Sequence, residues 1–146
     1  MIAPRAAPAA ALLATLACGR APVRTCNDEL GGRWHGAAGS YHLLDLRGRV
    51  ELYPTFRDLP ADLPAGVVAA PSVIDLTRRA NRALMRGTIT RRYERGTDFC
   101  RIQHAATLVR CGDDRLTIEI VLPQPPTDWI RCTGPSGPAT TLDLRR

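Results

Sequence analysis

The chain has 146 residues, a formal net charge of +6 at pH 7, five cysteines and a hydrophobic fraction of 45%. This length and composition indicate one globular domain and exclude a disordered or fibrous protein. No stretch approaches the roughly 20 apolar residues of a membrane-spanning helix, so a polytopic helical membrane protein is excluded. All 20 basic residues are arginines. An all-arginine set fits a GC-rich coding background as well as a selected surface, so the positive charge is weak support for nucleic acid binding. We therefore expect no nucleic acid partner.

The N-terminus has the layout of a secretory signal. Arg5 precedes an apolar run at 9–17, and no acidic residue occurs before it ends. This run is too short to span a membrane as a helix. Small residues at Thr15 and Ala17 favour cleavage after Ala17. We therefore expect residues 1–17 to be a signal peptide.

The sequence Thr15-Leu16-Ala17-Cys18 resembles the lipobox of bacterial lipoproteins. The resemblance implies that Cys18 becomes the new N-terminus and carries a lipid. The residue after Cys18 is Gly19 rather than aspartate, which in that family implies that the anchored protein is sorted to the outer membrane. Thr15 stands where the family usually has leucine, so secretion of a soluble protein after the same cleavage remains the alternative. We expect residues 18–28 to be the lipidated N-terminus and linker, and residues 29–146 to be a single β domain.

The first part of that domain predicts a tight hairpin. Apolar residues alternate over 41–46 and 49–53, on either side of an Arg47-Gly48 turn. The side chains expected on its buried face are those of Leu44, Leu46, Val50 and Leu52.

The segment 72–86 fits two structures. As a helix it has Ser72 as N-cap and Gly87 as terminator, with an apolar stripe between them. As a hairpin it has a strand at 73–77 that returns as 84–90 through a turn at 79–82. The local pattern favours the helix, whereas the neighbouring strands favour the hairpin.

Alternation in the second half of the chain predicts strands at 84–94, 99–110 and 115–122, then short strands at 129–133 and 140–144. The strand 115–122 has one apolar and one polar face, which is typical of an antiparallel sheet with one buried side. The apolar side chains expected on that side are Leu116, Ile118, Ile120 and Leu122, together with Ile102, Ala106 and Leu108 from the preceding strand.

The cysteine count supports export. If Cys18 carries a lipid, the remaining set is even, and it comprises Cys26, Cys100, Cys111 and Cys132. On one extended strand, Cys100 and Cys111 would lie on the order of 35 Å apart at about 3.3 Å per residue, which is too far for a disulfide. We therefore expect Cys26 to pair with one of them and Cys132 with the other. The spacings are not those of a zinc site.

About eight short strands joined by tight turns favour a mainly β fold, either a small antiparallel up-and-down barrel or a sandwich. Gly32-Arg33-Trp34, on the expected first strand, resembles the G-x-W signature of lipocalins and the wider calycin group. The resemblance implies that Trp34 packs at the closed end of a barrel, beneath an arginine from near the C-terminus. Arg131 and Arg145 are the candidates for that arginine.

The sequence contains no recognisable catalytic motif. The three histidines His35, His42 and His104 have no metal-ligand spacing, and no nucleophile motif or phosphate-binding loop occurs. We expect a protein that is not an enzyme and has no cofactor or metal. His104 falls on the apolar face of its strand, where it could donate a hydrogen bond inside a cavity or be satisfied by the backbone.

Two features go beyond a plain scaffold. The proline-rich loop at 54–71 could be a lid or docking rim over an open barrel end, or a tolerated insertion. An arginine-rich stretch could meet an anionic ligand or partner, or be a solvated face. The candidate anion-binding residues are Arg78, Arg79, Arg82, Arg86, Arg91 and Arg92.

These observations predict an exported, lipid-anchored protein of the outer membrane or periplasm that binds a small apolar or anionic ligand. The alternative is a protein-binding module, such as an inhibitor of a hydrolase, that uses the loop at 54–71.

Overall fold

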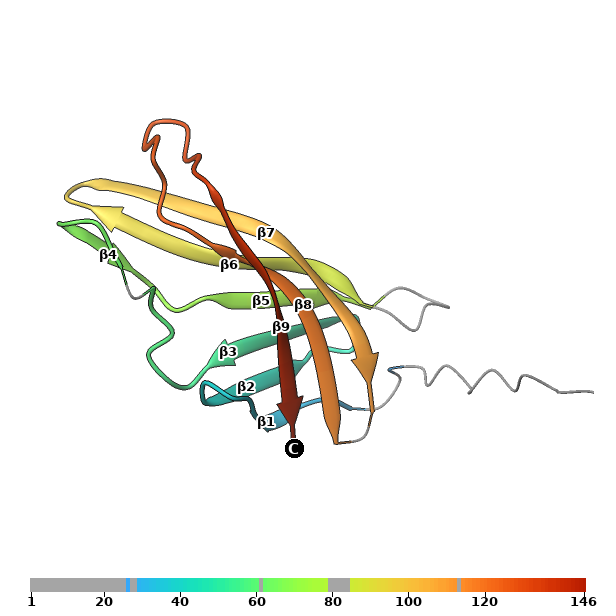
Figure 1. The fold of residues 1–146 in the computed structure, drawn as a ribbon. Coiled ribbons are helices and arrows are strands. Elements are labelled where there is room, and N and C mark those ends of the chain that lie inside the picture. The colour runs from blue at the N-terminus through green and yellow to red at the C-terminus, as the bar shows by residue number, and fades with distance from the viewer. Residues whose placement is uncertain (1–25, 27–28, 61, 79–84, 113) are drawn as a thin grey trace, which may run out of the picture.

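A computed structural model describes residues 26, 29–60, 62–78, 85–112 and 114–146 (Figure 1). Within these ranges the regular structure is all β-strand, without a helix. The strands are β1 (Gly32–His35), β2 (Ser40–Asp45), β3 (Arg49–Pro54), β4 (Val67–Ala69), β5 (Val73–Thr77), β6 (Arg86–Arg95), β7 (Asp98–Cys111), β8 (Arg115–Pro123) and β9 (Ser136–Arg145). No helix long and apolar enough to cross a membrane occurs in this described part.

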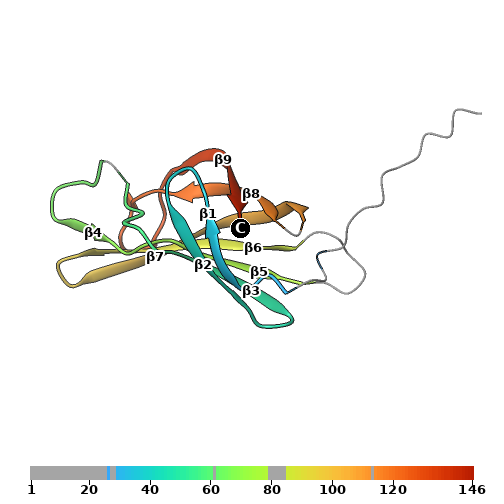
Figure 2. The ribbon, with the colours of Figure 1, turned by 90° about the horizontal axis from the view of Figure 1, so that it is seen from below.

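The strands form a closed antiparallel barrel with eight strand positions. β4 and β5 occupy one position, because both pair with β6, β4 near its end and β5 near its start. Around the barrel, strands follow their sequence order, and β6 pairs with β7 in addition to β5. The first and last strands close the ring through one pair of residues, His35 and Arg145 (Figures 1 and 2). The up-and-down barrel predicted from strand spacing is therefore confirmed.

The hairpin interpretation of 72–86 is correct, and the helix is wrong for the residues described there. β5 pairs with β6 in an antiparallel ladder from Val73 opposite Thr90 to Thr77 opposite Arg86. β5 also pairs with β3 on its other side. Two ladders thus satisfy the backbone of 73–77, which a helix would have satisfied locally. The expected turn at 79–82 lies outside the described residues.

The buried face predicted for the first hairpin is wrong for its first strand. Leu43 is buried, whereas Leu44 and Leu46 are exposed. The two-residue turn closes with a hydrogen bond from Leu46 N to Arg49 O, 2.8 Å long. It therefore sets Leu43 opposite Leu52, and directly opposed residues share a face of the sheet.

The short strand expected at 129–133 is also wrong. Residues 129–132 form a turn, flanked by an isolated bridge between Asp128 and Thr133. The carboxylate of Asp128 accepts hydrogen bonds from the backbone N–H groups of Ile130 and Arg131, each 3.0 Å long. Aspartate commonly stabilises turns in this way.

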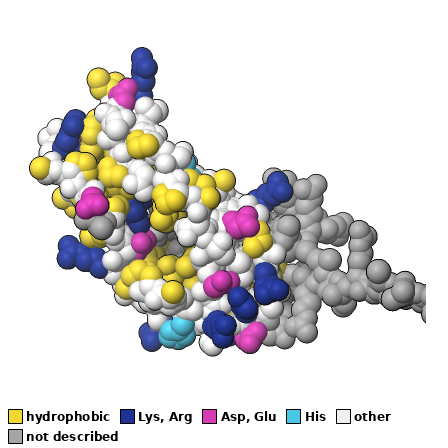
Figure 3. Space-filling view, viewed as in Figure 1, with side chains coloured by type: hydrophobic (Ala, Val, Ile, Leu, Met, Phe, Trp, Pro, Cys, Tyr) yellow, Lys and Arg dark blue, Asp and Glu magenta, His cyan; other side chains and the backbone are white. Residues whose placement is uncertain are grey.

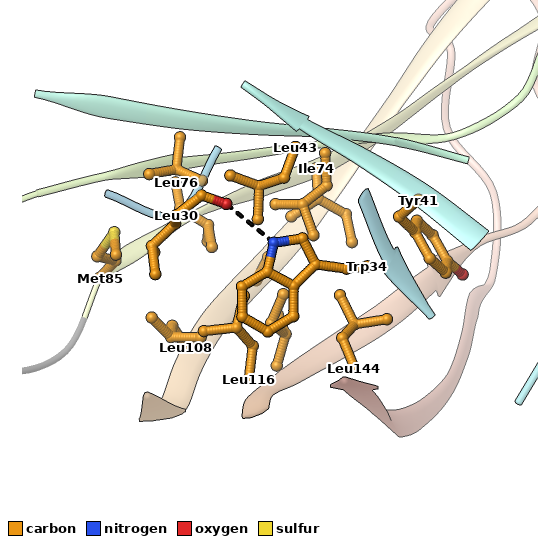
Figure 4. Packing of buried hydrophobic residues seen from close by; sticks show 14 of the residues in the cluster. Leu30, Trp34, Tyr41, Leu43, Ile74, Leu76, Met85, Leu108, Leu116 and Leu144 are labelled. Atoms are coloured by element: carbon orange, nitrogen blue, oxygen red, sulfur yellow. Dashed lines mark hydrogen bonds between the residues drawn. The ribbon is translucent and has the colours of Figure 1, made fainter. Parts of the chain in front are cut away.

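Two apolar clusters lie along the barrel axis. The larger surrounds Trp34, which is fully buried and donates a hydrogen bond from Nε1 to Leu30 O, 2.9 Å long (Figure 4). Every strand except β4 contributes to it. Cys26, within the expected linker 18–28, is buried in this cluster as well. The smaller cluster is centred on Tyr93 and Cys100 and lies toward the opposite end of β6 and β7.

Candidate binding site at the barrel mouth

Between the two clusters the inner wall becomes polar. Side chains of β6 alternate, so that Ile89, Arg91 and Tyr93 face inward. Arg91 is only 3% exposed, which is rare for a charged residue without a specific partner. His104 on β7 faces the same interior. It lies opposite Ile89, and it is two positions from the buried residues Ile102 and Ala106, so it shares their face of the strand. We call this polar layer, with the loop residues that contact it, the barrel mouth.

The loop between β3 and β4 supplies the acidic partner of Arg91. Asp58 Oδ2 lies 2.9 Å from Arg91 Nη2, and the backbone oxygen of Asp58 accepts a second hydrogen bond from the same atom at 3.0 Å. The Asp58 carboxylate also accepts a hydrogen bond from the hydroxyl of buried Ser72. Removing either partner would leave a poorly solvated charge, which is costly.

Apolar side chains fix the same loop over the mouth. Phe56 packs against the larger cluster and meets the ring of Tyr41 edge-on, with 5.3 Å between ring centroids. Leu59 and Leu63 pack against the smaller cluster. The described part of the loop therefore packs against both clusters, and its expected role as a lid or docking rim stays a prediction. Its apolar side chains are turned toward its own barrel.

Two tyrosines near the loop have perturbed pKa values. Burial, and next the negative charge of Asp58, raise the pKa of Tyr41 to about 12. Burial is also the main cause that raises the pKa of Tyr93. The hydroxyl of Tyr93 donates a hydrogen bond to Pro123 O, 2.6 Å long. Both phenols therefore lose their proton at a higher pH than an unperturbed tyrosine does.

Two buried nitrogen atoms in the mouth have no partner. Arg91 Nε and His104 Nε2 are each shielded from solvent and make no hydrogen bond within the described ranges. The two residues are diagonal neighbours on adjacent strands, since Arg91 lies opposite Ile102. Because buried polar groups are nearly always hydrogen-bonded, these nitrogen atoms are unusual, although Arg115 Nε is in the same state outside the mouth.

The inner face of β9 becomes less buried toward the start of the strand. Facing inward on this strand, Leu144 is fully buried, Leu142 is partly buried and Thr140 is exposed. Thr140 lies opposite Ile120 in the β8–β9 ladder, so the exposed end of β9 adjoins apolar surface. β1 pairs with β9 only at Arg145, so in the described structure residues 136–144 have no partner strand on that side.

Of the six arginines predicted to bind an anion, the four that the structure describes do not form one surface. Arg91 points into the barrel, and Arg78 is largely buried against Asp45 and the backbone oxygen of Cys26. Arg92 points outward and pairs with Glu94, at 2.9 Å. Arg86 is exposed at the start of β6, while Arg79 and Arg82 lie outside the described residues. Alternation along β6 explains why Arg91 and Arg92 separate.

The remaining predicted positions are as follows. Cys26 is bonded to Cys111 and Cys100 to Cys132, with Cα–Cα distances of 5.6 and 5.2 Å. This is one of the two pairings expected, and disulfides are typical of proteins in an oxidising, extracytoplasmic compartment. Cys18 lies outside the described residues.

Trp34 does lie beneath an arginine, but this is neither Arg131 nor Arg145. Arg146 stacks on it, with 5.1 Å from Cζ to the ring centroid. Its Nη2 also donates hydrogen bonds to Glu29 O at 3.1 Å and Gly31 O at 2.8 Å. The exposed side chain of Arg145 points away because neighbouring residues of a strand face opposite sides.

Sequence reasoning did not assign a role to Asp58 or Tyr41, and it gave Ser72 only the role of N-cap in the helix interpretation of 72–86. Asp58 and Arg91 are 33 residues apart, so no local spacing connects them. The available signal was the position of Arg91 between Ile89 and Tyr93, on the apolar face of β6.

No group of three or more His, Cys, Asp or Glu side chains suited to a metal ion occurs in the part of the chain that the structure describes. No protein-family model, curated protein or solved structure matches the chain in the three comparisons made.

Proposed function

We propose that this protein is an exported, lipid-anchored binding protein of the cell envelope that catalyses no reaction. Its ligand is a small apolar molecule with an acidic head group, held in the barrel mouth. The observation that carries this proposal is the pair of buried, unpartnered nitrogen atoms, Arg91 Nε and His104 Nε2. An eight-stranded barrel has an interior that suits one small ligand, and the stacking of Arg146 on Trp34 supports a lipocalin-like barrel.

The ligand chemistry follows from the surroundings of the mouth. A carboxylate is an acceptor for both nitrogen atoms, and a guanidinium binds it through charge-assisted hydrogen bonds. Phe56, Leu142 and Ile120 supply apolar surface for a hydrocarbon tail. Asp58 already pairs with Nη2 of the Arg91 guanidinium, so an incoming acid competes with Asp58 for that group. Binding of the acid therefore displaces the loop that carries Asp58.

Laurate and dodecanol provide the test, because they share a tail and differ in the acid. Calorimetric titration should detect laurate binding and weaker dodecanol binding. His104→Leu should weaken laurate binding about tenfold, as expected for one lost hydrogen bond to a charged group. Asp58→Asn keeps the size of the side chain but removes the competing charge. It should therefore tighten the binding of laurate and leave the binding of dodecanol unchanged.

His42→Gln is the matched control, since His42 is exposed on β2. It should bind laurate like the unmodified protein. Absence of laurate binding, or equal binding by the His104→Leu protein with its fold intact by circular dichroism, would reject the mouth as the site.

The anchor is tested separately. Replacing Cys18 by serine should move the protein from the membrane fraction to the soluble fraction, because the thiol that carries the lipid is gone. Unchanged membrane association would contradict lipid anchoring and leave the ligand proposal untouched.

Docking to a protein partner is a second candidate function. Ile130 is 97% exposed at the tip between β8 and β9, where Cys132 and Asp128 brace the turn. Figure 3 shows hydrophobic and basic side chains together at this end of the molecule. If the protein inhibits a hydrolase through this tip, Ile130→Ser should abolish inhibition while Leu46→Ser, at another exposed apolar residue, should not.

A further inference from the structure

A second concave site lies on the outer face of the barrel, away from the mouth. It is a groove of about 330 Å³ across β3, β5, β6 and β7. Its lining includes Arg49, Asp75, Thr90, Arg92, Arg101 and Gln103. This volume falls at the lower end of the range of roughly 300–1,000 Å³ for small-molecule sites.

One wall of the groove shows how the barrel manages like charges that face each other. Glu51 and Asp75 are directly opposite in the β3–β5 ladder. Arg49 bridges them, with Nη2 at 2.9 Å from Glu51 and Nε at 2.8 Å from Asp75. Opposed like charges on adjacent strands are destabilising, and the bridging cation offsets the repulsion.

The other wall carries the inverse arrangement without its bridge. Arg92 and Arg101 are directly opposite in the β6–β7 ladder. Arg92 pairs with Glu94 on its own strand, and its Cζ lies 5.2 Å from the centroid of the Phe99 ring. Arg101 makes no ion pair or hydrogen bond to any residue that the structure describes. This wall thus presents two cations with one counter-charge, Glu94, whereas Asp75 on the opposite wall is already paired with Arg49.

Uncharged donors extend this wall. Gln103 Nε2 donates a hydrogen bond to Thr90 Oγ1, 3.1 Å long. Since that bond uses an acceptor site on the hydroxyl, Thr90 keeps its own hydrogen for donation to another group. Arg92, Arg101 and Thr90 therefore bring donors from adjacent strands to the lining of one groove.

We propose that this groove binds the phosphate group of a small phosphate ester, in place of the missing bridging anion. Phosphate offers three terminal oxygens to donors that approach from several directions, whereas a planar carboxylate offers two. Arginine binds phosphate through paired hydrogen bonds, so Arg92 and Arg101 hold the anion between them. The site is independent of the barrel mouth and of the ligand proposed there.

Glucose 6-phosphate and inorganic phosphate are the soluble probes, and vesicles with phosphatidic acid are the membrane probe. In ¹⁵N-resolved NMR titrations at low salt, the soluble probes should shift the amide signals of Thr90, Arg101 and Gln103. The affinity should fall as salt rises. Arg101→Gln should weaken binding at least tenfold, the effect of losing hydrogen bonds to a charged group.

Arg33→Gln is the matched control, because Arg33 is an exposed arginine on β1 and the substitution removes the same charge. It should leave binding unchanged. Vesicle binding that Arg101→Gln abolishes, without binding of soluble esters, would identify a lipid headgroup as the source of the phosphate. No binding of any probe at millimolar concentration, or equal weakening by Arg33→Gln, would overturn the proposal.

Discussion

Gly87 lies where β5 and β6 approach closely enough to leave no room for a side chain. A Cβ atom at this position would lie 1.7 Å from Asp75 O and 2.9 Å from Leu76 Cα. Both contacts are to backbone, so neither can be relieved by a side-chain rotation. We predict that Gly87→Ala lowers the free energy of unfolding by about 2–3 kcal/mol.

Gly48→Ala is the control for that measurement, since no atom lies within 4 Å of the added carbon. Urea unfolding should place it within about 0.5 kcal/mol of the unmodified protein. Equal stability of the two variants would show that the β5–β6 ladder does not need the close approach.

Tyr41 gives the mouth a signature at alkaline pH. Its pKa is raised to about 12 by burial and by Asp58, so the folded state favours the neutral phenol more than the unfolded state does. This contribution to stability is fully present below pH 10 and is lost as pH rises toward 12. We predict a steeper loss of stability above pH 10 in the unmodified protein than in Tyr41→Phe.

Absorbance of the phenolate during alkaline titration checks this directly. The folded protein should lack a tyrosine that titrates at the ordinary pKa, because the pKa values of the other two tyrosines are also raised. The hydrogen bond to Glu51 raises the pKa of Tyr53, and burial raises the pKa of Tyr93. Titration of Tyr41 near pH 10 in the folded protein would contradict the packing of the loop between β3 and β4.

At the same scale, alternation identified buried residues well where a strand has one dry face. Leu116, Ile118 and Ile120 are buried as predicted. The error at Leu44 and Leu46 arose because apolar residues occur on both faces of β2, and only the turn decides between them. A two-residue turn places Leu43, rather than Leu44, on the face of Leu52.

At the scale of elements, the contact between the two ends of the described chain is short. β1 has four residues and meets β9 at one pair. Arg146 reinforces this junction by stacking on Trp34 and by binding two backbone oxygens before β1. Arg146→Ala should therefore lower the free energy of unfolding by about 1–3 kcal/mol, the combined range of a cation–π contact and charged hydrogen bonds.

Arg145→Ala removes the same charge from an adjacent exposed side chain and should cost less than about 0.5 kcal/mol. Thermal unfolding of both proteins separates stacking from net charge. Similar effects of the two substitutions would show that the stacking on Trp34 adds nothing beyond net charge.

The segment 72–86 shows why elements are harder to predict than faces. Its local pattern satisfies a helix, with Ser72 as cap and Gly87 as stop. In the barrel, Ser72 instead donates its hydroxyl to Asp58, and Gly87 permits close strand contact. Both residues are therefore used by partners distant in sequence, which a local pattern does not contain.

At the scale of the whole molecule, the two disulfides lie at opposite ends of β7. They close segments of very different length, with sequence separations of 85 for Cys26–Cys111 and 32 for Cys100–Cys132. Chain-entropy estimates give about 4–5 kcal/mol for the longer and about 3–4 kcal/mol for the shorter. We predict that serine substitution of the Cys26–Cys111 pair lowers the urea midpoint more than substitution of the Cys100–Cys132 pair.

Mass analysis without reductant should first establish two disulfides in the unmodified protein. A larger loss from the Cys100–Cys132 double variant would mean that the smaller apolar cluster, rather than unfolded-chain entropy, governs the ranking.

The molecule's general form could be predicted from the sequence, but its candidate sites could not. Strand number, turns and cysteine parity are local or countable properties, and they indicated a small stapled barrel. The mouth depends on Asp58 reaching Arg91 from a separate loop, and the outer groove depends on which residues of β6 and β7 stand opposite each other. Both are facts of register and tertiary contact.

The bond between Cys26 and Cys111 also determines how the barrel bears mechanical load. Tension along the N-terminal segment reaches Cys26 before it reaches β1, and the covalent bridge passes part of it into β7. β7 is gripped along its length by β6 and β8, whereas β1 is short and bonded to β9 at one position. A pull on the chain from this side would therefore load β7 through the disulfide as well as the short contact between β1 and β9.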